Sequence, residues 1–129
     1  PTIEYVFETE VEDPVFGAPE KIEEIFSMFP YLCFIGHTHA PGVITQEFRF
    51  FSPEECGYAF EFERGRKYLV NVGSVGQPRD RDNRSCYVVL DGRRMFYRRV
   101  PFDYGKVMEK VLDTGALHER VGTRLREGE

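Results

Sequence analysis

The sequence predicts an α/β protein in which helices pack against β-sheets. Apolar residues recur at helical spacing over residues 22–29, and apolar runs of strand length follow at residues 31–35 and 68–72. Alternating segments then flank an Asp-Gly pair within residues 85–100. A helix followed by buried strands and hairpins is typical of α/β sheet proteins. With 129 residues, of which 41% are hydrophobic, the chain can bury one modest core, so we expect one domain or part of one.

The first clear helix is expected after a segment without a period. Residues 1–16 scatter aromatic side chains among acids and are interpreted as helix or loop. Pro19 followed by Glu20 suits a first helical turn, where proline's missing N–H costs nothing and a carboxylate meets the positive end of the helix dipole. Pro30 ends this helix. Its apolar face, expected to pack on a sheet, consists of Ile22, Ile25, Phe26 and Phe29.

The buried strand at residues 31–35 leads into two closely spaced histidines. Gly36 frees the backbone to turn, and His37 and His39 come directly after it. Side chains at i and i+2 of an extended segment point to the same side, so the two imidazoles would lie about 6–7 Å apart. That spacing suits two metal ions about 3.5–4 Å apart better than a single closed zinc cage. The competing interpretation is a pair of ordinary loop histidines that bind no metal.

The middle of the chain alternates between apolar and polar residues and predicts half-buried strands. Residues 43–51 are predicted to form one strand, with one face made of Ile44, Gln46, Phe48 and Phe50. Residues 58–63 predict another, whose aromatic row is interpreted as core rather than as a platform for stacking bases: Tyr58, Phe60 and Phe62. After a turn at residues 64–66, the buried strand at residues 68–72 delivers the loop at residues 73–79 to one end of the sheet.

The last third of the sequence, from residue 85 on, predicts a hairpin and two helices. Residues 85–90 and 95–100 flank Asp91-Gly92, a strong hairpin signal because both turn positions tolerate positive φ. One helix, ended by Gly115, is predicted from the spacing of Val107, Met108, Val111 and Leu112. A second helix, with a polar and frayed tail after it, is predicted from Leu117, Val121 and Leu125.

The net charge of -5 hides an asymmetry between an acidic start and an arginine-rich later part. Acids crowd residues 4–24, and arginines crowd residues 79–99. The arginines fit either a basic lip for phosphate or a solvated surface in which Arg and Asp pair, because Arg79-Asp80-Arg81-Asp82 alternates in sign. Overall acidity and the lack of a basic-aromatic pattern argue against a nucleic-acid interface, so nucleic acid enters only as a substrate.

Three cysteines without a Cys-x-x-Cys spacing favour free thiols in a reducing cytoplasm over disulfides or a structural zinc site. They are Cys33, Cys56 and Cys86. The apolar runs are of strand length, and the start lacks processing patterns. We therefore expect a cytoplasmic protein without signal peptide or membrane anchor.

Two segments together resemble a known family. Gly36-His37-Thr38-His39 resembles the closing motif of the calcineurin-like metallophosphoesterases, and residues 71–79, Asn-Val-Gly-Ser-Val-Gly-Gln-Pro-Arg, resemble a second segment of their small bacterial and archaeal phosphodiesterase branch. The resemblance implies part of the four-layer αββα sandwich of that family, with strands and flanking helices. It also implies a hydrolase in which a metal-bound hydroxide at a dinuclear centre attacks a phosphodiester in line.

The resemblance assigns expected roles to residues of both segments. His37 and His39 would each bind one of two divalent metals, drawn from Mn, Fe, Zn, Ni and Co. Arg79 is a candidate substrate contact, because its rigid guanidinium fork suits phosphate, or else it pairs with Asp80 or Asp82 to brace its loop. No certain catalytic residue lies in the chain. The residues expected to shape the loops of the site are Gly36, Asn71, Gly73, Ser74 and Gly76.

Two imidazoles are too few for two metals, and the family's other ligand segments, Asp-x-His, Gly-Asp and Gly-Asn-His, are missing. In the family these segments come earlier in the chain, and residues 1–6 resemble the stretch directly after a further histidine-bearing segment. We therefore expect residues 1–129 to be the carboxyl-terminal part of a single metallophosphoesterase domain, with the amino-terminal metal-binding half absent. The expected partners are that complementary half, a phosphate-ester substrate and a second copy in a homo-oligomer.

Two alternatives remain at this point. A noncatalytic interaction scaffold on the same fold, as in the retromer scaffold subunit, would have lost the upstream ligands but is disfavoured by the intact His37 and His39. A cupin-type metal barrel also uses His-x-His, but residues 41–45 lack its usual carboxylate.

Overall fold

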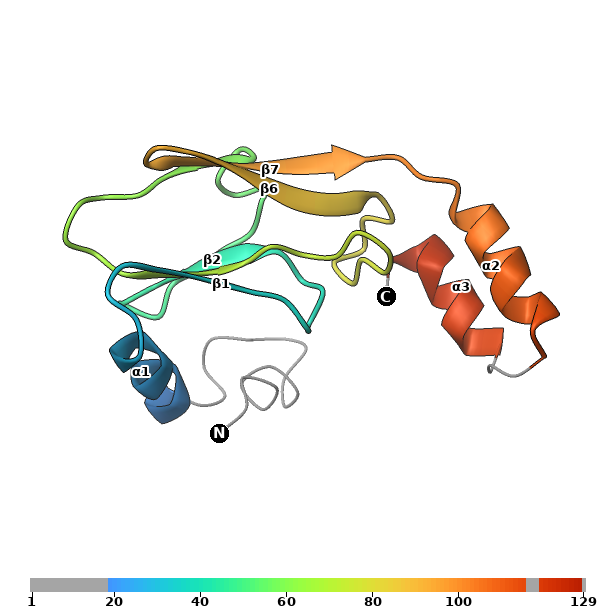
Figure 1. Cartoon of the computed structure of the whole chain (residues 1–129), viewed down its shortest axis with the longest axis horizontal. Coiled ribbons are helices and arrows are strands. Elements are labelled where there is room, and N and C mark those ends of the chain that lie inside the picture. The colour runs from blue at the N-terminus through green and yellow to red at the C-terminus, as the bar shows by residue number, and fades with distance from the viewer. Residues whose placement is uncertain (1–18, 116–118, 129) are drawn as a thin grey trace.

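A computed structural model describes residues 19–115 and 119–128 as two sheets with flanking helices (Figure 1). The first sheet has the strand order β1 (Leu32–Ile35), β5 (Tyr68–Asn71), β2 (Gly42–Thr45) and β3 (Phe50–Phe51). The second has the order β4 (Ala59–Glu61), β7 (Arg94–Val100) and β6 (Ser85–Asp91). The helices are α1 (Pro19–Ser27), α2 (Tyr104–Asp113) and α3 (Glu119–Glu127). The prediction of an α/β protein is confirmed.

Strand β5 lies inside the first sheet and carries the loop of the second motif. It pairs in parallel with β1 and antiparallel with β2, and all four of its residues are buried. Because β1 and β5 run in parallel, with Ile35 opposite Asn71, both strands end at the same edge of the sheet. The backbone N–H of Val72 still donates to the carbonyl of Ile35 at 3.0 Å. The histidine loop and the loop at residues 73–79 therefore leave the sheet together.

The apolar core lies on both faces of the first sheet. On one face, α1 buries three of its four predicted apolar residues against β1, β2 and β5 in a cluster of Ile22, Ile25, Phe26, Ile35, Ile44 and Leu69. The fourth, Phe29, follows the end of α1 and packs against this cluster while partly exposed. Between the two sheets lies a second cluster of Val43, Phe62, Tyr68, Val70, Cys86, Met95 and Tyr97. The predicted core role of the aromatic row is confirmed, because Tyr58 and Phe60 pack against this second cluster. The described helix and sheets thus form three layers.

Residues 43–51 form a hairpin, so the prediction of one continuous strand is wrong. The chain turns between β2 and β3, where the N–H of Thr45 donates to the carbonyl of Arg49 and the N–H of Phe48 donates to that of Thr45, both at 3.0 Å. Phe48 takes a φ of 59°, which period-2 alternation does not reveal. Phe48 and Phe50 nevertheless pack against the cluster under α1, because the turn returns the aromatic side chains to the same face.

The predicted hairpin of β6 and β7 and the two helices after it are confirmed, with differences in detail. Asp91 pairs with Arg94, and Gly92 has a φ of 57° while Asp91 does not enter the positive region. Gly115, with a φ of 59°, follows α2 as expected. Helices α2 and α3 pack on each other beyond the ends of the strands (Figure 1). Leu117 lies outside the described residues, as does the segment at residues 1–16.

The end of α3 is docked rather than frayed, contrary to the prediction. The N–H of Arg81 donates to the carbonyl of Gly128 at 2.9 Å, and the side-chain amide of Asn83 donates to that of Arg126 at 3.2 Å. The docking partner is the loop that follows Arg79, a contact no local pattern predicts.

The architecture excludes one of the two alternatives. The open sheets flanked by helices exclude the cupin-type barrel. Among the described helices, none combines the length and the apolar character needed to cross a membrane.

Candidate metal centre

Asn71, the last residue of β5, joins the two motif loops. Its side-chain amide donates to the hydroxyl oxygen of Thr38 at 2.6 Å, and its side-chain carbonyl accepts from the N–H of Gly73 at 2.9 Å. The backbone carbonyl of Asn71 accepts from the buried hydroxyl of Tyr97 at 2.9 Å. Only 3% of Asn71 is exposed, so these polar groups are satisfied within the protein. One buried side chain therefore fixes the histidine loop relative to the loop at residues 73–79.

The histidine loop is tightly turned, so the expectation of an extended His-x-His segment is wrong. His37 and His39 have φ values of 76° and 62°, whereas Gly36 stays outside the positive region. The N–H of Thr38 donates to the carbonyl of Gly36 at 3.0 Å, which closes a three-residue turn around His37. Left-handed backbone at non-glycine residues is strained and persists where surrounding contacts impose it, often at functional sites.

One ring nitrogen of His39 contacts a backbone carbonyl, and the other is free to bind a ligand. Its Nδ1 lies 2.6 Å from the backbone carbonyl of Gln77. A carbonyl only accepts, so Nδ1 is the donor of this contact, and in the neutral ring Nε2 then keeps a lone pair. Metal-binding histidines are commonly oriented by such a hydrogen bond from the other ring nitrogen to a carbonyl. The chemistry of this donor therefore fits a metal.

His37 is exposed, and no group of three or more His, Cys, Asp or Glu side chains that could hold a metal occurs within the described residues. The thiols do not change this. Burial raises the pKa of Cys86 to about 12, so that thiol stays protonated at neutral pH. Burial likewise raises the pKa of Cys33 and of Cys56. A complete centre built on His37 and His39 needs further ligands from elsewhere.

The glycines of the two motif loops differ in whether their position could hold a side chain. Gly73 has a φ of 79°, and a Cβ there would lie 2.9 Å from both Cβ and Sγ of Cys86. Gly36 and Gly76 have open space and no positive φ. The hydroxyl of Ser74 accepts from the N–H of Gln77 at 3.0 Å, which closes the bend that brings the Gln77 carbonyl to His39.

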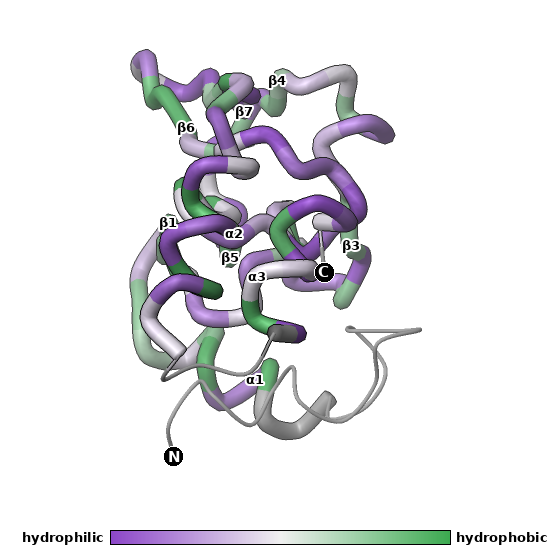
Figure 2. Tube along the Cα trace, turned by 90° about the vertical axis from the view of Figure 1, so that its right-hand side faces the viewer, coloured by the Kyte–Doolittle hydropathy of each residue, from purple (hydrophilic) through white to green (hydrophobic). Residues whose placement is uncertain are grey.

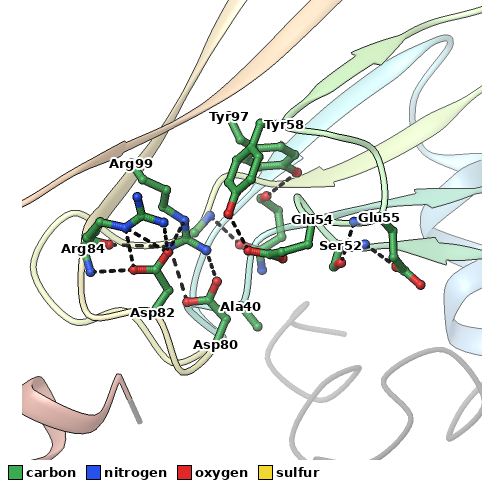
Figure 3. A network of polar contacts seen from close by, with 12 residues as sticks. Ala40, Ser52, Glu54, Glu55, Tyr58, Asp80, Asp82, Arg84, Tyr97 and Arg99 are labelled. Atoms are coloured by element: carbon green, nitrogen blue, oxygen red, sulfur yellow. Dashed lines mark hydrogen bonds and ion pairs between the residues drawn. The ribbon is translucent and has the colours of Figure 1, made fainter.

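The backbone of Arg79 lies beside His39, because the Arg79 N–H donates to the His39 carbonyl at 3.2 Å. Its two acidic neighbours are held by other arginines. Asp80 pairs with Arg99, and Asp82 pairs with Arg84 at 2.6 Å and with Arg99 at 3.4 Å (Figure 3). The two acids considered as partners of Arg79 are thus paired with Arg84 and Arg99.

Sequence reasoning missed Arg84 and Arg99, although a signal for Arg99 exists. Arg99 continues the period-2 series of Met95 and Tyr97 on β7, both of them buried. A charged residue at the third inward position of a strand requires a buried counter-charge. The alternating acids at residues 80–82 supply it.

Comparisons with known proteins agree with this architecture. No family model matches the chain. A search of solved structures matches a metallophosphoesterase from Sphaerobacter thermophilus, with a TM-score of 0.71 and 33% sequence identity over 81% of this chain and 44% of that one. The structure therefore has the fold of part of a metallophosphoesterase, a class of hydrolases, and the likeness supports that superfamily.

A curated relative adds sequence similarity. An uncharacterized protein of Methanocaldococcus jannaschii is 35% identical over 109 residues, which make up 83% of this chain and 43% of the relative. The chain thus spans less than half the length of each of these two proteins.

Proposed function

We propose that the chain is part of a metal-dependent phosphoesterase that hydrolyses phosphodiesters at a dinuclear centre. The fold likeness to a metallophosphoesterase at 33% identity supports the hydrolase class. The observation that carries the metal-dependent part is the 2.6 Å contact between His39 Nδ1 and the Gln77 carbonyl, which leaves Nε2 available as a ligand.

His39 would hold one divalent ion through Nε2, and the exposed His37 would hold the other. When bound, such ions polarise the phosphoryl oxygens and activate water at neutral pH. Imidazole together with carboxylate ligands accepts Mn, Fe, Zn, Ni or Co. The remaining ligands would come from a complementary amino-terminal half of the same domain, since the described residues offer no third ligand beside the two histidines.

The residues of this chain would orient the site and absorb charge. Asn71 holds the two loops together, and Gln77 fixes the tautomer of His39. Arg79 would bind a non-bridging phosphate oxygen, since a guanidinium stabilises the charge that develops on the transferred group. We assign no general acid to this chain.

The finer assignment is also a proposal. The segment at residues 71–79 favours the small bacterial and archaeal phosphodiesterase branch, and the three cysteines, all free thiols, favour the cytoplasm. The substrate would be a phosphate ester that enters beside Arg79.

The test is made in the chain extended by the proposed amino-terminal half. His37→Ala and His39→Ala are each expected to lower bound metal by about one ion and to suppress hydrolysis of bis(p-nitrophenyl) phosphate, because each removes a ligand of one position. Metal content and rate are measured on the same samples.

His118→Ala, which removes the third histidine of the sequence, is the matched control. Unchanged metal content and rate in both loop variants would reject the assignment. A wild-type protein that binds metal but hydrolyses no phosphoester would favour the noncatalytic scaffold instead.

A further inference from the structure

The segment from Arg79 to Arg84 alternates basic and acidic residues, which poses a problem for phosphate binding. A carboxylate beside an arginine competes with phosphate for the same guanidinium and repels the substrate. If Arg79 is to meet an anion, Asp80 and Asp82 must be neutralised by other groups. Which cations do this is therefore a functional question.

Arg99 is a buried residue that contacts the carboxylates of both Asp80 and Asp82. Its side chain is only 2% exposed, and those of Asp80 and Asp82 are 16% and 19% exposed. Arg99 lies on the inward face of β7, and its guanidinium pairs with Asp80 through Nη2 and reaches Asp82 Oδ2 at 3.4 Å through Nε. Figure 3 shows this guanidinium between the two acids. A buried arginine of this kind persists where its charge is matched.

Arg84 completes the neutralisation of Asp82. Its Nε and Nη2 contact both carboxylate oxygens at 2.6–3.1 Å, and its backbone N–H donates to Oδ1 at 3.0 Å. The Arg84 guanidinium holds the pKa of Asp82 below its usual value. Asp82 therefore stays ionised, and its carboxylate oxygens are held by Arg84.

Arg79 is joined to the histidine loop through its backbone. It is exposed, its backbone is hydrogen-bonded to His39, and no ion pair of its side chain occurs in the described part of the chain. Asp80 and Asp82 lie one and three residues after Arg79, and both pair with Arg99 of β7.

We propose that Arg99 is a positioning residue that withdraws Asp80 and Asp82 from Arg79 and so keeps Arg79 available to bind phosphate. This rests on the proposed function for the identity of the anion. Arg99 itself touches neither metal nor substrate.

The experiment compares Arg99→Met with the triple variant Arg99→Met/Asp80→Asn/Asp82→Asn in the extended chain. The single variant frees Asp80 and removes one of the two partners of Asp82, whose carboxylate Arg84 still holds. Asp80 can then pair with Arg79, so KM for the phosphodiester and Kd for inorganic phosphate are expected to rise about tenfold, the loss of one charge-assisted hydrogen bond. The triple variant removes the competing charges and is expected to regain both values. It should also fold well, since the buried charges are replaced together and only Arg84, whose side chain is 43% exposed, loses its carboxylate partner.

Hydrogen exchange of the amides at residues 79–84 separates positioning from bracing. If Arg99 only braces the loop, exchange and KM stay raised in the triple variant, and the proposal is overturned. Unchanged KM in Arg99→Met, or a wild type that binds no phosphate, also overturns it. Phosphate affinity that shows the expected pattern in an enzyme without turnover would instead support Arg99 and reject the phosphoesterase.

Discussion

At the scale of single residues, the candidate site concentrates backbone strain next to its two histidines. His37 and His39 both occupy left-handed backbone, which costs roughly 1–2 kcal/mol per non-glycine residue. The strain is offset by buried contacts at Asn71 and by the carbonyl of Gln77. Glycine at residue 37 would relieve the strain, as glycine does at residue 73, so the retained strain agrees with the proposed role of the imidazoles.

Gly73 provides a residue-scale prediction because it is both left-handed and tightly packed. Gly73→Ala places a Cβ 2.9 Å from Cys86 and 3.1 Å from Pro41 at a φ of 79°. We expect a loss of about 2–5 kcal/mol in the free energy of unfolding, the sum of the left-handed penalty and overpacking. Urea unfolding measures it.

Gly76→Ala, three residues further on, is the control. It meets no atom within 4 Å and has no positive φ, so its effect should stay within about 0.5 kcal/mol. Equal effects in the two variants would show that the close approach of Gly73 to Cys86 does not constrain this loop.

At the scale of elements, the predictable parts are those fixed by local pattern. The face of α1, the buried strand β5 and the β6–β7 hairpin follow from apolar spacing and from Asp91-Gly92. The β2–β3 turn does not, because Phe48 keeps the aromatic alternation while its backbone turns left-handed. The backbone conformation of Phe48 is therefore set by tertiary contacts and not by the intrinsic preference of phenylalanine for strands.

The docking of α3 on the loop after Arg79 gives an element-scale prediction. Gly128→Ala places a Cβ 2.9 Å from backbone atoms of Arg81 and Asp82, at a φ of 70°. Backbone cannot move aside cheaply, so we expect the end of α3 to detach and the amides of residues 81–83 to exchange faster. Hydrogen exchange with mass readout detects this.

Gly115→Ala isolates the conformational part of that effect. Gly115 also has a positive φ, 59°, but meets no atom within 4 Å. It should cost about 1–2 kcal/mol without altering exchange at residues 81–83. Faster exchange there in Gly115→Ala, or no change in Gly128→Ala, would contradict the docking.

At the scale of the whole molecule, the sequence predicts where the candidate site lies but not the geometry of its loops. Resemblance picked out both loops, and the parallel pairing of β1 with β5 explains why segments more than thirty residues apart in sequence meet. The turn at His37 is closed by a local backbone hydrogen bond beside Asn71, and Asp80 pairs with Arg99 of the second sheet. No short motif encodes either contact.

The two-sheet sandwich has one closed and one open side. On the closed side, Phe51 of β3 and Phe60 of β4 lie 5.9 Å apart between ring centroids. On the other side lie β1 and β6, toward the left in Figure 2, and within the described residues β1 pairs only with β5 and β6 only with β7. Phe34 of β1 is 42% exposed at this side. An unpaired strand edge with an exposed apolar residue offers a surface on which another chain can pack.

If the proposed complementary half covers this open side, Phe34→Thr should act differently in the two forms of the protein. In the 129-residue chain it should reduce self-association and change stability little, since Phe34 is already exposed and threonine favours strands. In the extended chain it should lower the free energy of unfolding by about 3–5 kcal/mol, as for other buried phenylalanines. Light scattering and urea unfolding give the two readouts. Leu112→Gln, equally exposed at 42% but on α2, should leave the extended chain nearly unchanged; equal, small losses for both variants would mean that another surface meets the complementary half.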